Sequence, residues 1–235
     1  MNIGVLIFAG MDQIDFTGPF EVFSRIPGAN IHVIAKSRTP IRDYHGLILT
    51  PDVVLAEAPP LDLLHVPGGP GQQDLMDDEP VLSFIRRHFD SGGYIFSVCT
   101  GALLCGAAGI LRGRRATTHW AAFDLLPFFG AIPVDSRVVV DGKLISAAGV
   151  TAGIDGALTL VSLLCGDELA QRIQLSMEYA PAPPFQAGSP RTAPPEILRS
   201  VTAEFRELTE SRRVTVERVA ARLGMKKAGP CEPAK

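Results

Sequence analysis

Cys99 lies where a β-prone segment meets a helix-prone segment, in the string YIFSVCTGALLCGAAG. Residues 94–98 are apolar and favour a strand, and residues 102–108 are small and compatible with a helix. A nucleophile on a sharp strand-to-helix turn needs small neighbours, and Ser97 and Gly101 provide them two positions to either side. The helix dipole is expected to lower the pKa of such a thiol. A buried structural cysteine is the alternative.

Three further segments carry groups that could serve a reactive thiol. Asp15 lies in the polar string AGMDQIDFTG, expected to be a loop, where its carboxyl could exchange a proton with the thiol or be an ordinary turn aspartate. Gly68 and Gly69 end a predicted strand, and their N–H groups could form an oxyanion pocket or a simple turn. Thr100 could polarise a substrate or cap the helix.

A histidine and a threonine follow further along the chain. His119 could form a catalytic Cys–His pair with Cys99, but a role as a helix cap or as the partner of Trp120 is at least as compatible with the sequence. Thr151 precedes a buried helix and is expected to be its N-cap. Cys105 is expected to fill the core.

These residues need a scaffold, and the order of the predicted elements indicates one. Short continuous apolar runs, typical of strands buried on both faces, occur at residues 3–8, 31–35, 61–66 and 94–98. Helices are expected after Pro19, over 79–89 and after Cys99, and Asp141-Gly142 predicts a hairpin. This alternation predicts a mostly parallel α/β sheet with helices on both faces, whose ligand site lies beyond the strands' carboxyl ends.

Composition excludes several classes of function. The 235 residues carry a net charge of −3 with 20% charged residues, so no basic nucleic-acid footprint is visible. The most apolar window, 144–165, is interrupted by glycines and an aspartate, and the N-terminus has no basic segment, so we expect neither a membrane span nor a signal peptide. A cytoplasmic protein with free thiols is the consequence.

Metal ions and phosphate cofactors have no recognisable motif in the chain. No pair of the four cysteines has CxxC spacing, and no phosphate-binding glycine loop is present, so we expect no metal and no cofactor. Cys165 is expected in the core, and Asp12, Asp43 and Glu57 are expected to be solvated.

The C-terminal part follows a proline-rich segment over 179–195, expected to wrap the domain without regular structure. We expect a catalytic domain at 1–190 and C-terminal helices at 191–224, which pack on it or on a dimer partner. Within the latter, 195–209 and 214–223 predict two helices. Residues 225–235 are expected to be a disordered tail.

Several strings together resemble the ThiJ/PfpI superfamily. They are the acidic loop with Thr17-Gly18-Pro19, the VPGG turn, the Cys99 elbow and the downstream His119. The resemblance implies a flavodoxin-like sandwich and a homodimer, with Cys99 as nucleophile. The strings DFTGP, SVCTGALLCGAAGIL, RRATTHW, GVTAGID and EYAPAPPFQAGSP look like the isonitrile-hydrating branch of that superfamily.

The branch implies an activity and residue roles. It implies hydration of a small isonitrile to an N-substituted formamide, with Asp15 as the acid that bonds the cysteine and Val150 near the sulfur. Thr100 stands where peptidases of the superfamily carry a histidine, which argues against peptidase activity. Thr100, Gly69 and the Val150-Thr151 loop are then expected around the substrate.

Alternatives from three classes remain open. They are a glyoxalase or deglycase reaction, an oxidation sensor using Cys99, and a ligand-binding remnant of AraC-type regulators. The last shares GVTAGID and the C-terminal VTVERVAARLGM. The chain then ends in KKAGPCEPAK, which is too short for a recognition helix, so direct DNA binding is not expected.

Overall fold

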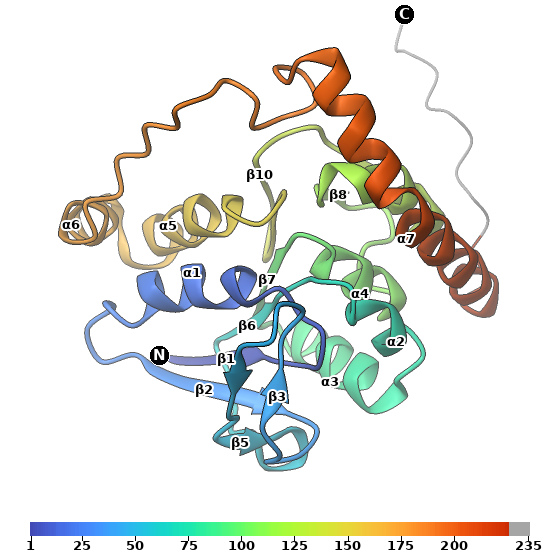
Figure 1. Ribbon diagram of the computed structural model, residues 1–235. Helices are drawn as coiled ribbons and strands as arrows, with labels where there is room; N and C mark the ends of the chain where they lie inside the picture. Colours follow the sequence, from blue (N-terminus) through green and yellow to red (C-terminus); the bar gives the residue numbers. More distant parts are fainter. Residues whose placement is uncertain (226–235) are drawn as a thin grey trace, which may run out of the picture.

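A computed structural model describes residues 1–225, built around a seven-stranded sheet (Figure 1). The strand order is β10-β11-β7-β6-β1-β2-β5, and only the β10–β11 pair is antiparallel. These strands are β1 (Asn2–Leu6), β2 (Asn30–Ala35), β5 (Val53–Val54), β6 (Leu63–Val66), β7 (Tyr94–Val98), β10 (Val138–Asp141) and β11 (Leu144–Ala147). The predicted mostly parallel sheet is confirmed, and so is the hairpin, in which Gly142 has a φ of 60°.

Helices cover both faces of the sheet, as the sequence predicts (Figure 1). On one face lie α1 (Gln13–Phe23), α5 (Ala152–Cys165) and α6 (Asp167–Ser176). On the other lie α2 (Gln72–Leu75), α3 (Glu79–Asp90), α4 (Gly101–Ala107), the 3₁₀ helix η2 (Trp120–Phe129) and α7 (Pro195–Arg222). Two small strand pairs, β3 (Ile41–Arg42) with β4 (Ile48–Leu49) and β8 (Arg115–Ala116) with β9 (Ile132–Pro133), and the short helix η1 (Leu55–Glu57) complete the fold.

The centre of the sheet brings the candidate residues to one edge. Strands β1, β6, β7 and β11 are parallel neighbours, so their carboxyl ends lie together. The register pairs Val66 with Ser97 and Val98 with Ala147. The segments that leave these strands carry the start of α1, the Gly68-Gly69 turn, Cys99 and the residues before α5. The predicted convergence of these segments on one edge is therefore confirmed.

Helix α1 begins earlier than the sequence predicts, which changes the setting of Asp15. The side chain of Asp12 accepts a hydrogen bond from the N–H of Ile14 and caps the helix, so Asp15 lies in its first turn and not in a loop. Pro19 is inside the helix rather than in its first turn. A proline leaves the carbonyl four residues earlier, here that of Asp15, without its helical donor, and His65 Nε2 lies 2.8 Å from that carbonyl oxygen.

The C-terminal segment forms one helix, so the prediction of two helices was wrong. No glycine or proline interrupts Pro195–Arg222, and the residues around position 212 are compatible with a helix. Val216 and Val219 are fully buried against the rest of the domain. The regulator-like string therefore forms the end of α7, packed on its own domain.

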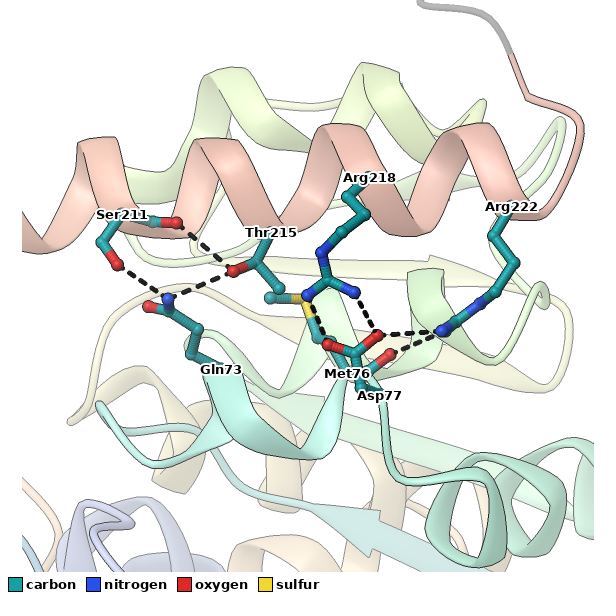
Figure 2. Close-up of polar contacts among 7 residues, drawn as sticks. All are labelled: Gln73, Met76, Asp77, Ser211, Thr215, Arg218 and Arg222. Atoms are coloured by element: carbon teal, nitrogen blue, oxygen red, sulfur yellow. Dashed lines mark hydrogen bonds and ion pairs between the residues drawn. The ribbon is translucent and has the colours of Figure 1, made fainter.

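Ion pairs and hydrogen bonds hold α7 to α2 and the residues that follow it (Figure 2). Asp77 receives both Arg218 and Arg222, with Nη1 to Oδ1 distances of 2.7 and 2.8 Å. Gln73 Nε2 donates to Ser211 Oγ at 2.8 Å and to Thr215 Oγ1 at 3.2 Å. Arg222 also donates to the carbonyl of Met76. Together these contacts fix the position of α7 along and against α2.

Some predictions about individual residues were wrong. Asp43 is buried, because its carboxylate accepts the N–H groups of His45 and Leu47 in a turn. Cys165, at the end of α5, is exposed rather than in the core. The prediction for Glu57 is confirmed, because this side chain is exposed, where it pairs with Arg38 at 2.6 Å. The expected tail falls, from residue 226 on, outside the described residues.

Residues 1–225 contain neither a membrane-spanning helix nor a metal-binding cluster. No helix within residues 1–225 is long and apolar enough to cross a membrane. Over the same residues, no group of three or more histidine, cysteine or acidic side chains is arranged to hold a metal ion.

Candidate active site

The turn at Cys99 has the sharp geometry that its small neighbours predict. Cys99 has a φ of 55°, an unusual conformation for a residue with a side chain. A Cβ on Gly101 would lie 2.1 Å from the carbonyl oxygen of Val66, so a larger residue cannot occupy that position without a shift. Thr118 Oγ1 donates to the Cys99 carbonyl at 2.7 Å. The turn at Cys99 therefore packs against the end of β6 and is hydrogen-bonded to the segment after β8.

Asp15 is placed next to the thiol and is completely buried. Its Oδ2 accepts the N–H of Gly68 at 3.0 Å, its Oδ1 is buried without a hydrogen-bond partner among residues 1–225, and its charge acts on Cys99. Burial, assisted by the nearby charge of Asp12, raises the pKa of Asp15 from 3.8 to about 7. A carboxyl with this pKa can accept and return a proton at neutral pH.

Burial also raises the pKa of the Cys99 thiol well above 9.0, and the charge of Asp15 adds to the effect. Backbone N–H groups of Thr100 and Val150 bond the sulfur and oppose this rise, but they do not reverse it. The expectation of a lowered thiol pKa was therefore wrong, because desolvation outweighs the helix terminus. The thiol can become nucleophilic by passing its proton to Asp15 rather than to bulk water.

Val150, whose backbone N–H lies at the sulfur of Cys99, has a strained backbone conformation. Its φ of 30° is rare for a β-branched residue. Thr151 follows as the residue before α5, but its side chain makes no capping hydrogen bond; its Oγ1 instead accepts from Arg137 at 3.2 Å. The prediction that the side chain of Thr151 caps α5 was therefore wrong.

Gly68, Gly69 and Thr100 form a connected group beside the thiol. The N–H of Gly69 donates to Thr100 Oγ1 at 3.1 Å, and this hydroxyl lies 3.3 Å from the Gly69 carbonyl, to which it donates. Thr100 makes no side-chain cap of α4. Since the Gly68 N–H is bonded to Asp15, both glycine amides are already occupied. Their expected role as substrate-facing donors is not supported; the amides of Thr100 and Val150 face the reacting sulfur instead.

His119 serves as the cap of η2. Its Nδ1 accepts the N–H of Ala121 at 3.2 Å, and its ring packs against Trp120 and Phe205. Burial, together with the charge of Arg212, lowers its pKa to about 4. No hydrogen bond between His119 and Cys99 occurs within residues 1–225, so the structure favours the capping alternative over a Cys–His pair.

A cavity of about 560 Å³ lies on the far side of the Gly149-Val150 segment, and Cys99 is not part of its wall. His119, Trp120, Phe123, Gly149 and Val150 are part of its wall. The residue that bonds the sulfur therefore also borders this cavity. A small group bound there would be separated from the buried thiol by Val150.

Two buried polar residues of the site were missed by the sequence. His65, inside β6, has Nδ1 3.0 Å from the Phe96 carbonyl and Nε2 2.8 Å from that of Asp15. Burial lowers its pKa to about 4, and the bonds to the two carbonyl oxygens oppose that shift. A lone histidine in an apolar strand was the available signal. Arg212 of α7 is the other, and only its place on an otherwise apolar helix face could have revealed it.

Comparison with known proteins agrees with this geometry. The model of the DJ-1/PfpI family matches residues 1–163, and the chain belongs to that family. The chain is 46% identical to the isonitrile hydratase of Pseudomonas putida, over 96% of this chain and 99% of the relative. A deglycase of Pyrococcus abyssi is 31% identical, over 63% of this chain and 89% of that protein.

A solved structure supports the fold over nearly the whole chain. A ThiJ/PfpI family protein from Pseudomonas syringae superposes with a TM-score of 0.89 at 39% identity, covering 92% of this chain and 90% of that one. The flavodoxin-like α/β class implied by the sequence resemblance is confirmed.

Proposed function

We propose that this chain adds water to an isonitrile and releases an N-substituted formamide, with Cys99 as nucleophile. The proposal rests on one arrangement, an elbow cysteine paired with a buried aspartate, in a chain 46% identical over nearly its full length to an isonitrile hydratase. An acid with a pKa of about 7 beside the sulfur fits a reaction that must move a proton off the thiol and deliver it to carbon.

The first step forms a carbon–sulfur bond. The thiol proton passes to Asp15 as the sulfur attacks the terminal isonitrile carbon, and Asp15 then delivers the same proton to that carbon. The product is a thioimidate, R–N=CH–S–Cys99. The backbone N–H groups of Thr100 and Val150 hold the sulfur's negative charge until attack occurs.

The second step uses water. Asp15, ionised after the first step, takes a proton from the water that attacks the thioimidate carbon and passes that same proton to the imine nitrogen. Collapse of the R–NH–CH(OH)–S–Cys99 adduct breaks the carbon–sulfur bond and releases R–NH–CHO, while the hydroxyl proton returns to the sulfur. Atoms and charge balance without metal or organic cofactor, and none is proposed.

The substituent of the isonitrile would occupy the cavity beside Val150. Trp120, Phe123 and Val150 give its wall an apolar part, whereas Thr151 contributes a hydroxyl. Because Val150 stands between this cavity and Cys99, the isonitrile group would reach the sulfur past that residue. We further expect a cytoplasmic homodimer, as the superfamily resemblance implies, with size-exclusion chromatography coupled to light scattering as the test of its mass.

The decisive experiment incubates the purified protein with an alkyl isonitrile and, in parallel, with methylglyoxal. We expect formamide by mass spectrometry and a Cys99 adduct of substrate mass when the reaction is quenched early. Consumption of methylglyoxal without formamide would favour the glyoxalase or deglycase alternative. Rapid peroxide oxidation of Cys99 without turnover of either compound would favour the sensor, and tight binding without turnover the regulator remnant.

A further inference from the structure

Arg212 is a charged residue on the buried face of α7. Val216 and Val219, four and seven residues later, are fully buried, so Arg212 occupies the position that a helix stripe normally gives to an apolar side chain. It is only 4% exposed. A charge in such a position is costly unless the structure supplies a counter-charge.

No carboxylate forms an ion pair with Arg212 in the described part of the chain, although α7 has arginines that do pair. Arg218 and Arg222, further along the same helix, share Asp77 at the domain surface (Figure 2). Arg212 instead donates from Nη2 to the Gly69 carbonyl at 3.3 Å, and its buried Nε has no hydrogen-bond partner. A buried guanidinium nitrogen without a partner is uncommon, so hydrogen bonding alone does not account for the position of Arg212.

The contacts of Arg212 lead directly to the reacting thiol. Gly69, which it bonds, is joined to the hydroxyl of Thr100, the residue after Cys99. The charge of Arg212 acts on two titratable neighbours, lowering the pKa of Cys99 and that of His119. The influence on Cys99 is the smallest of those that act on this thiol, but the hydrogen bonds through Gly69 and Thr100 tie the buried guanidinium to the segment that carries the sulfur.

We propose that Arg212 is the counter-charge for the anionic sulfur of Cys99, supplied by a helix beyond the residues that the family model covers. It is a positioning residue, since it acts on the sulfur through space and through the Gly69–Thr100 bonds. A guanidinium suits this task because it stays protonated even when buried. The assignment rests on Cys99 being the nucleophile of the proposed hydration.

The other charged groups near the pair do not supply this cation. Asp15 faces Cys99 from α1 and disfavours a second negative charge, and Asp12 adds to the field on Asp15. His119 faces Arg212 from the cap of η2 and is neutral with a pKa of about 4. Arg212 is thus the cation whose removal should change the ionisation of Cys99.

The test measures alkylation of Cys99 by iodoacetamide, a neutral reagent, as a function of pH from about 6 to about 9, with peptide mass spectrometry to assign the site. Arg212→Gln keeps a donor for the Gly69 carbonyl but removes the charge. We expect its Cys99 alkylation rate to fall about tenfold at each pH, equivalent to a rise of about one pKa unit. Arg212→Lys should recover most of the rate. Isonitrile kcat/KM should follow the same order.

Arg213→Met is the matched control, because Arg213 is the next residue of α7 and its guanidinium lies over the Phe128 ring instead of near Cys99. It should leave the alkylation profile unchanged. Thermal melting shows whether each variant is folded. If Arg212→Gln is unfolded, Arg212→Met serves as the uncharged variant instead. An unchanged profile in a folded, uncharged variant, or an equal loss in Arg212→Lys, would overturn the assignment.

Alkylation needs no isonitrile, so the two proposals can fail separately. If the profile shifts as expected but no formamide forms, the function is wrong and the counter-charge stands. If formamide forms and the profile does not move, only the role of Arg212 is wrong.

Discussion

Cys99 and Cys105 are two buried thiols in one short segment, yet only the first is placed for chemistry. Both have raised pKa values because of burial, to about 12 for Cys105. Cys105 lies within α4. Cys99 has a strained backbone, two N–H donors at its sulfur, and Asp15 as a proton acceptor. Burial therefore does not distinguish a reactive thiol from core filler; what distinguishes it is a neighbour that can take the proton.

The largest expected effect separates the two cysteines by activity. Cys99→Ala should lower isonitrile hydration by about a thousandfold or more, because the nucleophile is lost, whereas Cys105→Ala should retain most activity. Formamide production, measured beside circular dichroism of each variant, is the readout. Substantial turnover by folded Cys99→Ala would show that Cys99 is not the nucleophile.

A second prediction removes the proton acceptor. Asp15→Asn should lower kcat about a hundredfold to a thousandfold, because the asparagine cannot take the thiol proton. It is isosteric and can still accept the Gly68 N–H, so the fold should remain. Initial rates across pH, with mass spectrometry of the trapped adduct, would test this; normal activity of Asp15→Asn would transfer the role to another group.

The same substitution has a consequence for stability. The folded pKa of Asp15, about 7, lies above its ordinary 3.8, so the folded state holds the proton more tightly. The contribution of Asp15 to stability is complete below about pH 4 and is lost as pH rises to about 7, by as much as about 4 kcal/mol. Asp15→Asn should lack this decline. Urea unfolding at a series of pH values checks it, and parallel curves for both proteins would contradict it.

Added methyl groups sharpen the contrast between the elbow and the rest of α4. A Cβ on Gly101 would meet backbone, the Val66 carbonyl, whereas one on Gly106 would lie 2.2 Å from the ring of Phe129. Gly101→Ala should cost about 3 kcal/mol and much of the activity, and Gly106→Ala about 1 to 2 kcal/mol with activity kept in the folded fraction. Denaturant unfolding and specific activity distinguish them, and equal loss of activity would contradict a local role for the elbow.

The smallest effect concerns labelling of the native chain. Exposed Cys165 should react with iodoacetamide in the native chain, and buried Cys105 should react only after unfolding. Peptide mapping with and without denaturant measures both. Rapid native labelling of Cys105 would show that α4 opens locally.

The sequence allowed the elbow to be predicted because its rule is local. The sharp turn at Cys99 requires small residues within two positions, because larger ones would collide. The buried strands can be predicted from their short, continuous apolar runs. The convergence of Asp15 and Gly68 on that elbow also followed, since parallel strands send their carboxyl ends to one edge. The helix around Asp15 was missed because Pro19 normally marks a helix start, whereas here it lies inside α1 and the carbonyl of Asp15 is met by His65, a residue far away in the sequence.

By itself, the sequence determined the α/β class, the position of the thiol and the acid that meets it, because these depend on short patterns and on the geometry of parallel sheets. The tertiary structure decided the charge state of the site. Desolvation raises the pKa values of Cys99 and Asp15, and α7 brings Arg212 against a segment more than a hundred positions earlier. Solvent exclusion and long-range contact are properties of the folded chain, and no local pattern of residues encodes them.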